Sequence, residues 1–364
     1  MLPFKKIKFF IFLAIAFLCV SRIISACKPI NQSTNQPITQ LGKYLFFDRR
    51  LSINQTRSCG TCHNPQFAFT DGYKRSLGAF ADLHQRNTQP LFNLSELKYL
   101  TASDSSLHNP LQQMNNPLFN THPIEMGIKG NEVIILKRIE TDETYLQLFS
   151  KASLHLSWEN IKIAIAQFTL SIKSKSSPYD KFIKGDSNAL SINEKKGKDL
   201  FFSAKTKCAS CHGGNNFNTP SLINAKGEID FYFNTGLYNI DGNGTYPLYD
   251  QGLLQHTKNN NDMGKFRVPT LRNLAYTAPY MHDGSIASLN EAIDLYINGG
   301  RKITNGINKG DGTKNKYRHP LINQISITKE EKKNLLSFLL TLSDAAFIKN
   351  AEYQNPFLED ETKK

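Results

Sequence analysis

The apolar residues of this chain recur at helical spacing in several segments and rarely alternate as they would along strands. Residues 131–149 and 158–172 show this spacing, and Ser157 stands at the expected N-cap of the second segment. Later helices are marked by capping boxes, in which a Ser or Thr is followed three positions on by a Glu. These boxes are Ser191 with Glu194, Ser288 with Glu291, and Thr328 with Glu331. The pattern predicts a mainly α-helical fold.

A weak internal repeat indicates two similar domains. The sequence GKYLFF at residues 42–47 returns as GKDLFF at residues 197–202, and each copy predicts a short helix. Residues 213–265 are rich in Gly, Asn, Asp and Tyr, which predicts long loops. We place the domains at residues 40–190 and 191–345, followed by a loose polar tail at residues 346–364.

Two Cys-x-x-Cys-His runs carry the clearest chemistry. They comprise Cys59, Cys62 and His63, then Cys208, Cys211 and His212. The thiols of such a run can add to the two vinyl groups of a haem, and the adjacent His can bind the iron. A zinc half-site or a redox Cys pair is the alternative for a single run, but zinc needs no His directly after the second Cys. The sequence therefore predicts two cytochrome c-like domains, each with one covalent c-type haem, joined by long loops.

The first 26 residues predict an export signal, with three Lys before an apolar run at residues 9–20. Residues 24–27 (ISAC) form a lipobox-like pattern, so we expect Cys27 to be acylated and to anchor the chain to the membrane on the periplasmic side. Ordinary cleavage and an uncleaved anchor are the alternatives. Polar residues 27–39 predict a flexible tether.

The chain is basic, with a formal net charge of +13. For an exported haem protein this charge favours an acidic protein partner or the membrane surface over nucleic acid. A solvated Lys-rich surface without a partner explains the charge equally well.

Motifs in order from residue 42 to residue 342 resemble the bacterial di-haem cytochrome c peroxidase family. They are RLS at residues 50–52, SCGTCHNP at 58–65, AFTDG at 68–72, RNT at 86–88, IEM at 124–126, FRVPTLRN at 266–273 and TAPYMHDG at 277–284. The resemblance implies a peroxidase that reduces hydrogen peroxide to water. It also implies a small cytochrome c or copper protein as electron donor, with electrons entering through the C-terminal haem.

The resemblance further implies roles for individual residues. Glu125 would lie over the open face of the first haem as the acid–base carboxylate. Tyr296 falls where the peroxidases usually carry a Met ligand to the second iron, although from spacing alone it is a core Tyr on an apolar helix stripe. Asn87, Thr277 and Pro279 match an interdomain site for a calcium ion, a cation that prefers oxygen ligands.

Two departures from the family stand out. The segment at residues 99–103 (YLTAS) lacks the Trp that bridges the haems in the family, and Tyr99 is a candidate substitute. No His matches the one that reversibly blocks the first haem in many members, and His84 is interpreted as a surface residue.

Three functions stay open. A Tyr at position 296 is similar to the methylamine-utilisation branch, whose members oxidise residues of a partner protein. The chain would then be a Tyr-ligated oxidase rather than a peroxidase. A plain di-haem electron carrier, with both irons closed by protein ligands, is the third possibility. A homodimer is compatible with all three.

Overall fold

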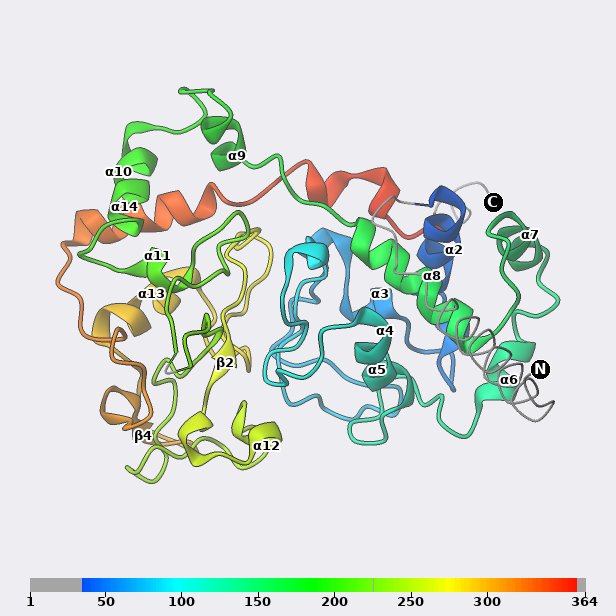
Figure 1. Cartoon of the computed structure of the whole chain (residues 1–364), viewed down its shortest axis with the longest axis horizontal. Coiled ribbons are helices and arrows are strands. Elements are labelled where there is room, and N and C mark those ends of the chain that lie inside the picture. The colour runs from blue at the N-terminus through cyan, green and yellow to red at the C-terminus, as the bar shows by residue number, and fades with distance from the viewer. Residues whose placement is uncertain (1–34, 225, 359–364) are drawn as a thin grey trace, which may run out of the picture. The chain divides into compact units, whose positions relative to one another are not determined.

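The computed structural model describes residues 35–224 and 226–358, and these residues are mainly helical with few strands (Figure 1). The predicted export signal and Cys27 lie outside the described residues. Within this part of the chain, no helix is long and apolar enough to cross a membrane. The predicted tether at residues 27–39 ends earlier than expected, because helix α2 already begins at Gln36.

We call residues 36–190 the first half and residues 191–343 the second half. The helices of the first half are α2 (Gln36–Phe47), α3 (Cys59–Cys62), α4 (Pro110–Gln113), α5 (Asn115–Phe119), α6 (Glu132–Lys137), α7 (Glu143–Lys151), α8 (Trp158–Ser171) and α9 (Pro178–Ile183). Those of the second half are α10 (Ile192–Phe201), α11 (Cys208–Cys211), α12 (Leu254–Thr257), α13 (Leu289–Asn298) and α14 (Lys329–Leu340). Short 3₁₀ turns are η1 (Arg49–Leu51), η2 (Pro65–Phe67), η3 (Leu94–Glu96), η4 (Asn260–Asp262), η5 (Gly312–Lys314), η6 (Phe347–Lys349) and η7 (Ala351–Tyr353).

Strands form two short antiparallel pairs in the second half. In the first, β1 (Tyr232–Phe233) pairs with β2 (Phe266–Arg267), and in the other, β3 (Lys302–Ile303) pairs with β4 (Gly310–Asp311). Long loops fill most of residues 213–265, as the sequence predicted.

The helix starts confirm the capping predictions. Ser157 accepts a hydrogen bond at the start of α8, and the three capping boxes close at the starts of α10, α13 and α14. The single helix predicted over residues 131–149 is wrong, since the structure has α6 and α7 there. Asp142 separates them, because its carboxylate accepts the N–H of Tyr145 and starts a new helix.

The repeated sequence GKxLFF forms the same kind of helix crossing in both halves. Gly42 of α2 lies against the Ala164 carbonyl of α8, and Gly197 of α10 lies against the Asn334 carbonyl of α14. A Cβ at either glycine would overlap that carbonyl oxygen, so only glycine allows the helices to approach this closely. Figure 1 shows α10 crossing α14.

The segment after residue 343 returns to the first half and is not a loose tail up to residue 358. The rings of Phe347 and Tyr353 are buried in the first-half core, where each packs against Phe69. The carboxylate of Asp344 accepts the N–H groups of Ala346 and Phe347 and so fixes the start of η6. The polar composition of the segment hid these two aromatic anchors; residues 359–364 lie outside the described part.

Candidate functional site

The first Cys-x-x-Cys-His run forms α3 and places its His with a defined orientation. Ser58 and Thr61 close a capping box at the start of α3. Nδ1 of His63 lies 2.9 Å from the carbonyl oxygen of Phe69. A carbonyl can only accept, so Nδ1 carries the proton and Nε2 keeps a free lone pair for a metal.

The second run repeats this geometry. Nδ1 of His212, which follows α11, donates to the carbonyl oxygen of Phe217 at 3.0 Å. Burial lowers the pKa of His63, and it lowers the pKa of His212 to about 4, so both imidazoles are neutral near pH 7. Neutral imidazoles with one nitrogen fixed by a backbone carbonyl are the form that binds iron.

The four thiols beside these imidazoles are free. Burial raises the pKa of Cys62 and of Cys211 to about 11, and it raises the pKa of Cys59 and Cys208 as well. In the described residues, no group of three or more His, Cys, Asp or Glu side chains could hold a metal ion. Each run therefore offers two thiols and one imidazole nitrogen, a set that fits a covalently attached haem and lacks the further ligands of a zinc site.

Glu125 lies near the first run. Besides burial, the negative charge of Glu125 raises the pKa of Cys59. The backbone of Glu125 is held by the preceding loop, since the Ala79 N–H donates to the Glu125 carbonyl at 2.9 Å. The carboxyl side chain is 32% exposed, and its partly buried setting raises its pKa to about 7. A carboxyl group with this pKa can both take and release a proton near neutral pH.

His84 lies beside Glu125, and the sequence did not predict this proximity. Its Nδ1 lies 3.7 Å from Glu125 Oε1, and its side chain is only 19% exposed. Burial lowers the pKa of His84. The interpretation of His84 as a surface residue is therefore wrong. Only the folded chain brings the two residues together. An antiparallel bridge between Leu77 and Leu83 forms a hairpin, and this hairpin is hydrogen-bonded to the Glu125 segment through Ala79.

Tyr296 of α13 lies near the second run. Burial raises its pKa, and the nearby thiols of Cys211 and Cys208 raise it further. Met263 and Met281 are packed around the same small apolar cluster. The structure thus brings Tyr296 together with the second Cys-x-x-Cys-His run, as Glu125 is brought to the first.

The other predicted site residues are placed as follows. The Asn87 N–H donates to the His282 carbonyl at 2.8 Å, which joins it to the segment that contains Thr277 and Pro279. The calcium site itself stays a prediction. Tyr99 packs edge-on against Phe231 and against Tyr232, with ring centroids 5.4 Å apart in each case.

Two neutral, carbonyl-anchored imidazoles, each preceded by two free thiols, define a c-type cytochrome with two haem-binding runs. Comparison with known proteins gives the family. The family model described as di-haem cytochrome c peroxidase matches residues 36–188. The cytochrome-c peroxidase IdrP1 of Pseudomonas sp. (strain SCT) is 31% identical over 333 residues, which cover 83% of this chain and 80% of that protein.

Two further relatives belong to the MauG type. The methylamine utilization protein MauG of Methylorubrum extorquens is 31% identical over 269 residues, covering 72% of this chain and 69% of that protein. A solved structure described as a MauG-like protein associated with microbial copper homeostasis is 39% identical, with a TM-score of 0.86. It covers 91% of this chain and 96% of its own. The chain belongs to the di-haem cytochrome c peroxidase family and is an oxidoreductase.

Proposed function

We propose that this chain reduces hydrogen peroxide to water with electrons from a small cytochrome c or copper protein that enter through the C-terminal haem. The observation that carries the proposal is Glu125, a carboxyl with a pKa of about 7 beside the first haem-binding run. Export to the periplasmic side, with a lipid anchor at Cys27, belongs to the same proposal.

In this proposal residues 40–190 and 191–345 are two cytochrome c-like domains with one haem each. The first haem is held by Cys59, Cys62 and His63, and the second by Cys208, Cys211, His212 and Tyr296. Bound haem supplies the electron-transfer chemistry, and the chain supplies ligation and proton handling. Glu125 takes the proton from one peroxide oxygen and returns it to the oxygen that departs as water. Asn87, Thr277 and Pro279 hold a calcium ion between the domains.

Steady-state turnover of hydrogen peroxide with reduced cytochrome c tests the proposal. We expect the variant E125Q to lose activity by a factor of about 10² to 10⁴, the usual contribution of one acid–base group. Glu140, an exposed carboxyl, provides the matched control E140Q, which should be as fast as the parent. An E125Q variant as fast as the parent would remove the assigned base.

A second candidate is a Tyr-ligated oxidase that modifies residues of a partner protein. Tyr296 beside the second run favours it, as does the 39% identity to the MauG-like structure. A partner linked to copper handling is part of this candidate. It predicts that oxidising equivalents persist after peroxide is added and that small donors are oxidised slowly. Rapid decay with ordinary small donors would count against it.

A plain electron carrier is separated from both by the ferric spectrum. A high-spin component, or a spectral shift on adding cyanide, would show that one iron is open to a small molecule. Neither signal would appear if both irons were closed by protein ligands.

A further inference from the structure

The loop that holds the second imidazole is itself anchored. The carbonyl of Phe217 accepts the ring Nδ1–H of His212, and the two residues before Phe217 also have carbonyls that accept from side chains. The Thr270 hydroxyl donates to the Asn216 carbonyl at 2.7 Å, and Arg272 Nε donates to the Asn215 carbonyl at 2.7 Å. The carbonyls of three successive residues, 215 to 217, therefore each accept a hydrogen bond from a side chain, and the third accepts it from the His212 imidazole.

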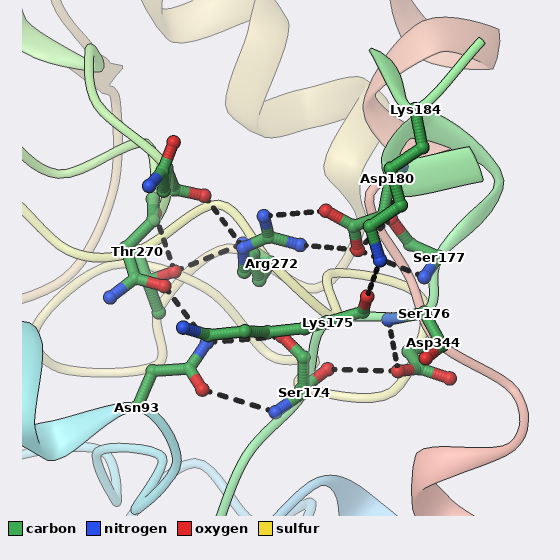
Figure 2. A network of polar contacts seen from close by, with 12 residues as sticks. Asn93, Ser174, Lys175, Ser176, Ser177, Asp180, Lys184, Thr270, Arg272 and Asp344 are labelled. Carbon is green, nitrogen blue, oxygen red and sulfur yellow. Dashed lines mark hydrogen bonds and ion pairs between the residues drawn. The ribbon is translucent and has the colours of Figure 1, made fainter. Parts of the chain in front are cut away.

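Arg272 is fixed in turn by a buried ion pair (Figure 2). Its Nη1 and Nη2 donate to the two carboxylate oxygens of Asp180 in α9, at 2.9 and 2.8 Å, and both side chains are almost fully buried. Although burial alone would raise it, the hydrogen bonds from Arg272 and from Ser177 keep the pKa of Asp180 below its usual range. The pair is therefore ionised, and the guanidinium has one orientation.

A second residue of the first half, Asn93, also contributes to this anchor. The side-chain Nδ2 of Asn93 donates to the Asn216 side-chain oxygen at 2.9 Å and to the Ser174 carbonyl. The Asn93 side-chain oxygen accepts the backbone N–H of Ser174. Figure 2 shows Asn93 and Ser174 facing each other beside the Arg272–Asp180 pair. The loop next to His212 is thus held by Thr270 and Arg272 of the second half and by Asn93 of the first half, while Asp180 of α9, also in the first half, orients Arg272.

The internal repeat supplies a comparison within one chain. Asn93 and Asn273 are equivalent: each is buried with a positive φ, and their N–H groups donate to carbonyls just after α8 and α14, at Ile172 and Leu342. The residue before each Asn differs.

In the second half this preceding residue is Arg272, and in the first half it is Phe92. The ring of Phe92 packs on Phe347, with centroids 5.6 Å apart. The residue at this equivalent position therefore makes an apolar ring contact in the first half and an ion pair in the second. Because a buried ion pair is seldom more stabilising than a well-packed apolar pair, stability does not explain Arg272. Its difference from Phe92 is the donor that it gives to the loop.

We propose that Arg272, oriented by Asp180, is a positioning residue for His212. By holding the Asn215 carbonyl, it fixes the backbone that presents the Phe217 carbonyl to His212 Nδ1, and so sets the strength of that hydrogen bond. A stronger bond makes the imidazole a better donor to ferric iron. The inference rests on the proposed role of His212 as an iron ligand. It means that Arg272 adjusts the ligand strength of His212 without affecting that of His63.

The test measures the reduction potentials and ferric spectra of both haems in the full, haem-loaded chain. Two variants remove the anchor differently. R272K keeps a positive charge for Asp180 but loses the two-pronged guanidinium and the Nε donor to Asn215. The double variant R272M/D180L replaces the ion pair with two apolar side chains. We expect the potential of the second haem to rise in both variants, while the potential of the first haem stays at its parent value.

R301K is the matched control, because Arg301 also lies in the second half and donates to Ser285 instead. T270V, which removes the neighbouring carbonyl donor, should shift the second potential in the same direction, and it keeps the test available if the double variant does not fold. Unchanged potentials in R272K and T270V would overturn the inference, as would an equal shift of both haems. A parent protein without a low-spin haem at His212 would instead contradict the proposed function.

Discussion

One acidic group, Glu125 or Tyr296, lies near each haem-binding run, and burial raises the pKa of both with different consequences. The pKa of Glu125 rises to about 7, so this carboxyl exchanges protons in the neutral range. The pKa of Tyr296 rises from an ordinary value of 10, so its phenol stays protonated unless a cation binds it. One side chain is suited to move protons, and the other to give up its proton only to a metal ion.

The pH dependence of peroxide turnover follows from Glu125. A base must be ionised before it can accept a proton, so kcat/KM for peroxide should rise with pH up to about 7 and then level off. In E125Q this rise should disappear along with most of the rate. A pH series of initial rates on both proteins measures it; a profile in E125Q with the parent's midpoint would assign the titration to another group.

His84 should shift that midpoint. Nδ1 of His84 lies 3.7 Å from the Glu125 carboxylate, and a proton on that nitrogen would favour the ionised carboxylate, so removing the ring should move the midpoint to higher pH. H84F removes the donor, H84Q retains one, and Q85A changes an exposed neighbour as the control. We expect the order H84F above H84Q, with Q85A equal to the parent. Identical midpoints in all four proteins would show that His84 does not act on Glu125.

Sequence patterns found the residues whose chemistry depends on near neighbours in the chain. Cys59, Cys62 and His63 are adjacent, so one motif encoded their geometry. The pair of His84 and Glu125 is made by a hairpin that folds back on a distant segment, which no local spacing encodes. Tyr296 and Glu125 were selected through family resemblance, since helix periodicity alone placed Tyr296 in the core.

At the scale of elements, each half depends on one close helix crossing. The predicted caps marked where four helices begin, α8, α10, α13 and α14, because a cap is a local hydrogen bond. The break at Asp142 was missed, because the apolar spacing continues across it from α6 to α7. Which helices cross could not be read from periodicity, although the repeated Gly at positions 42 and 197 marked the crossing point on one helix of each pair.

The crossing at Gly197 predicts a strong effect of one methyl group. In G197A the new Cβ meets the Asn334 carbonyl, which belongs to a helix backbone and cannot move alone. We expect a loss of about 1–3 kcal/mol or more in the free energy of unfolding, the range for overpacked cores. K196A, at an exposed position of the same helix, should change it by less than about 0.5 kcal/mol. Urea unfolding of both variants decides; equal stabilities would mean that α10 and α14 can move apart freely.

At the scale of the whole molecule, the core of the first half is not built from the first half of the sequence alone. The last described segment crosses back, and its aromatic rings complete the core of the first half. The domain boundaries drawn from the repeat could not show this return, because each repeat unit looks complete in sequence. The first core is therefore finished only when the C-terminal end of the chain has been made.

This return predicts that a C-terminal substitution acts on the N-terminal site. Removing the buried ring in F347A should cost about 3–5 kcal/mol, whereas L358A in the exposed end of the same segment should change stability little. Trp158, the single Trp, packs against the first core, so its fluorescence reports unfolding of that half. Phe347 touches Phe69, whose carbonyl fixes His63, so the ferric spectrum of the first haem should change in F347A while that of the second stays constant. A change confined to the second haem would contradict this account, because it would show that the segment serves the other half.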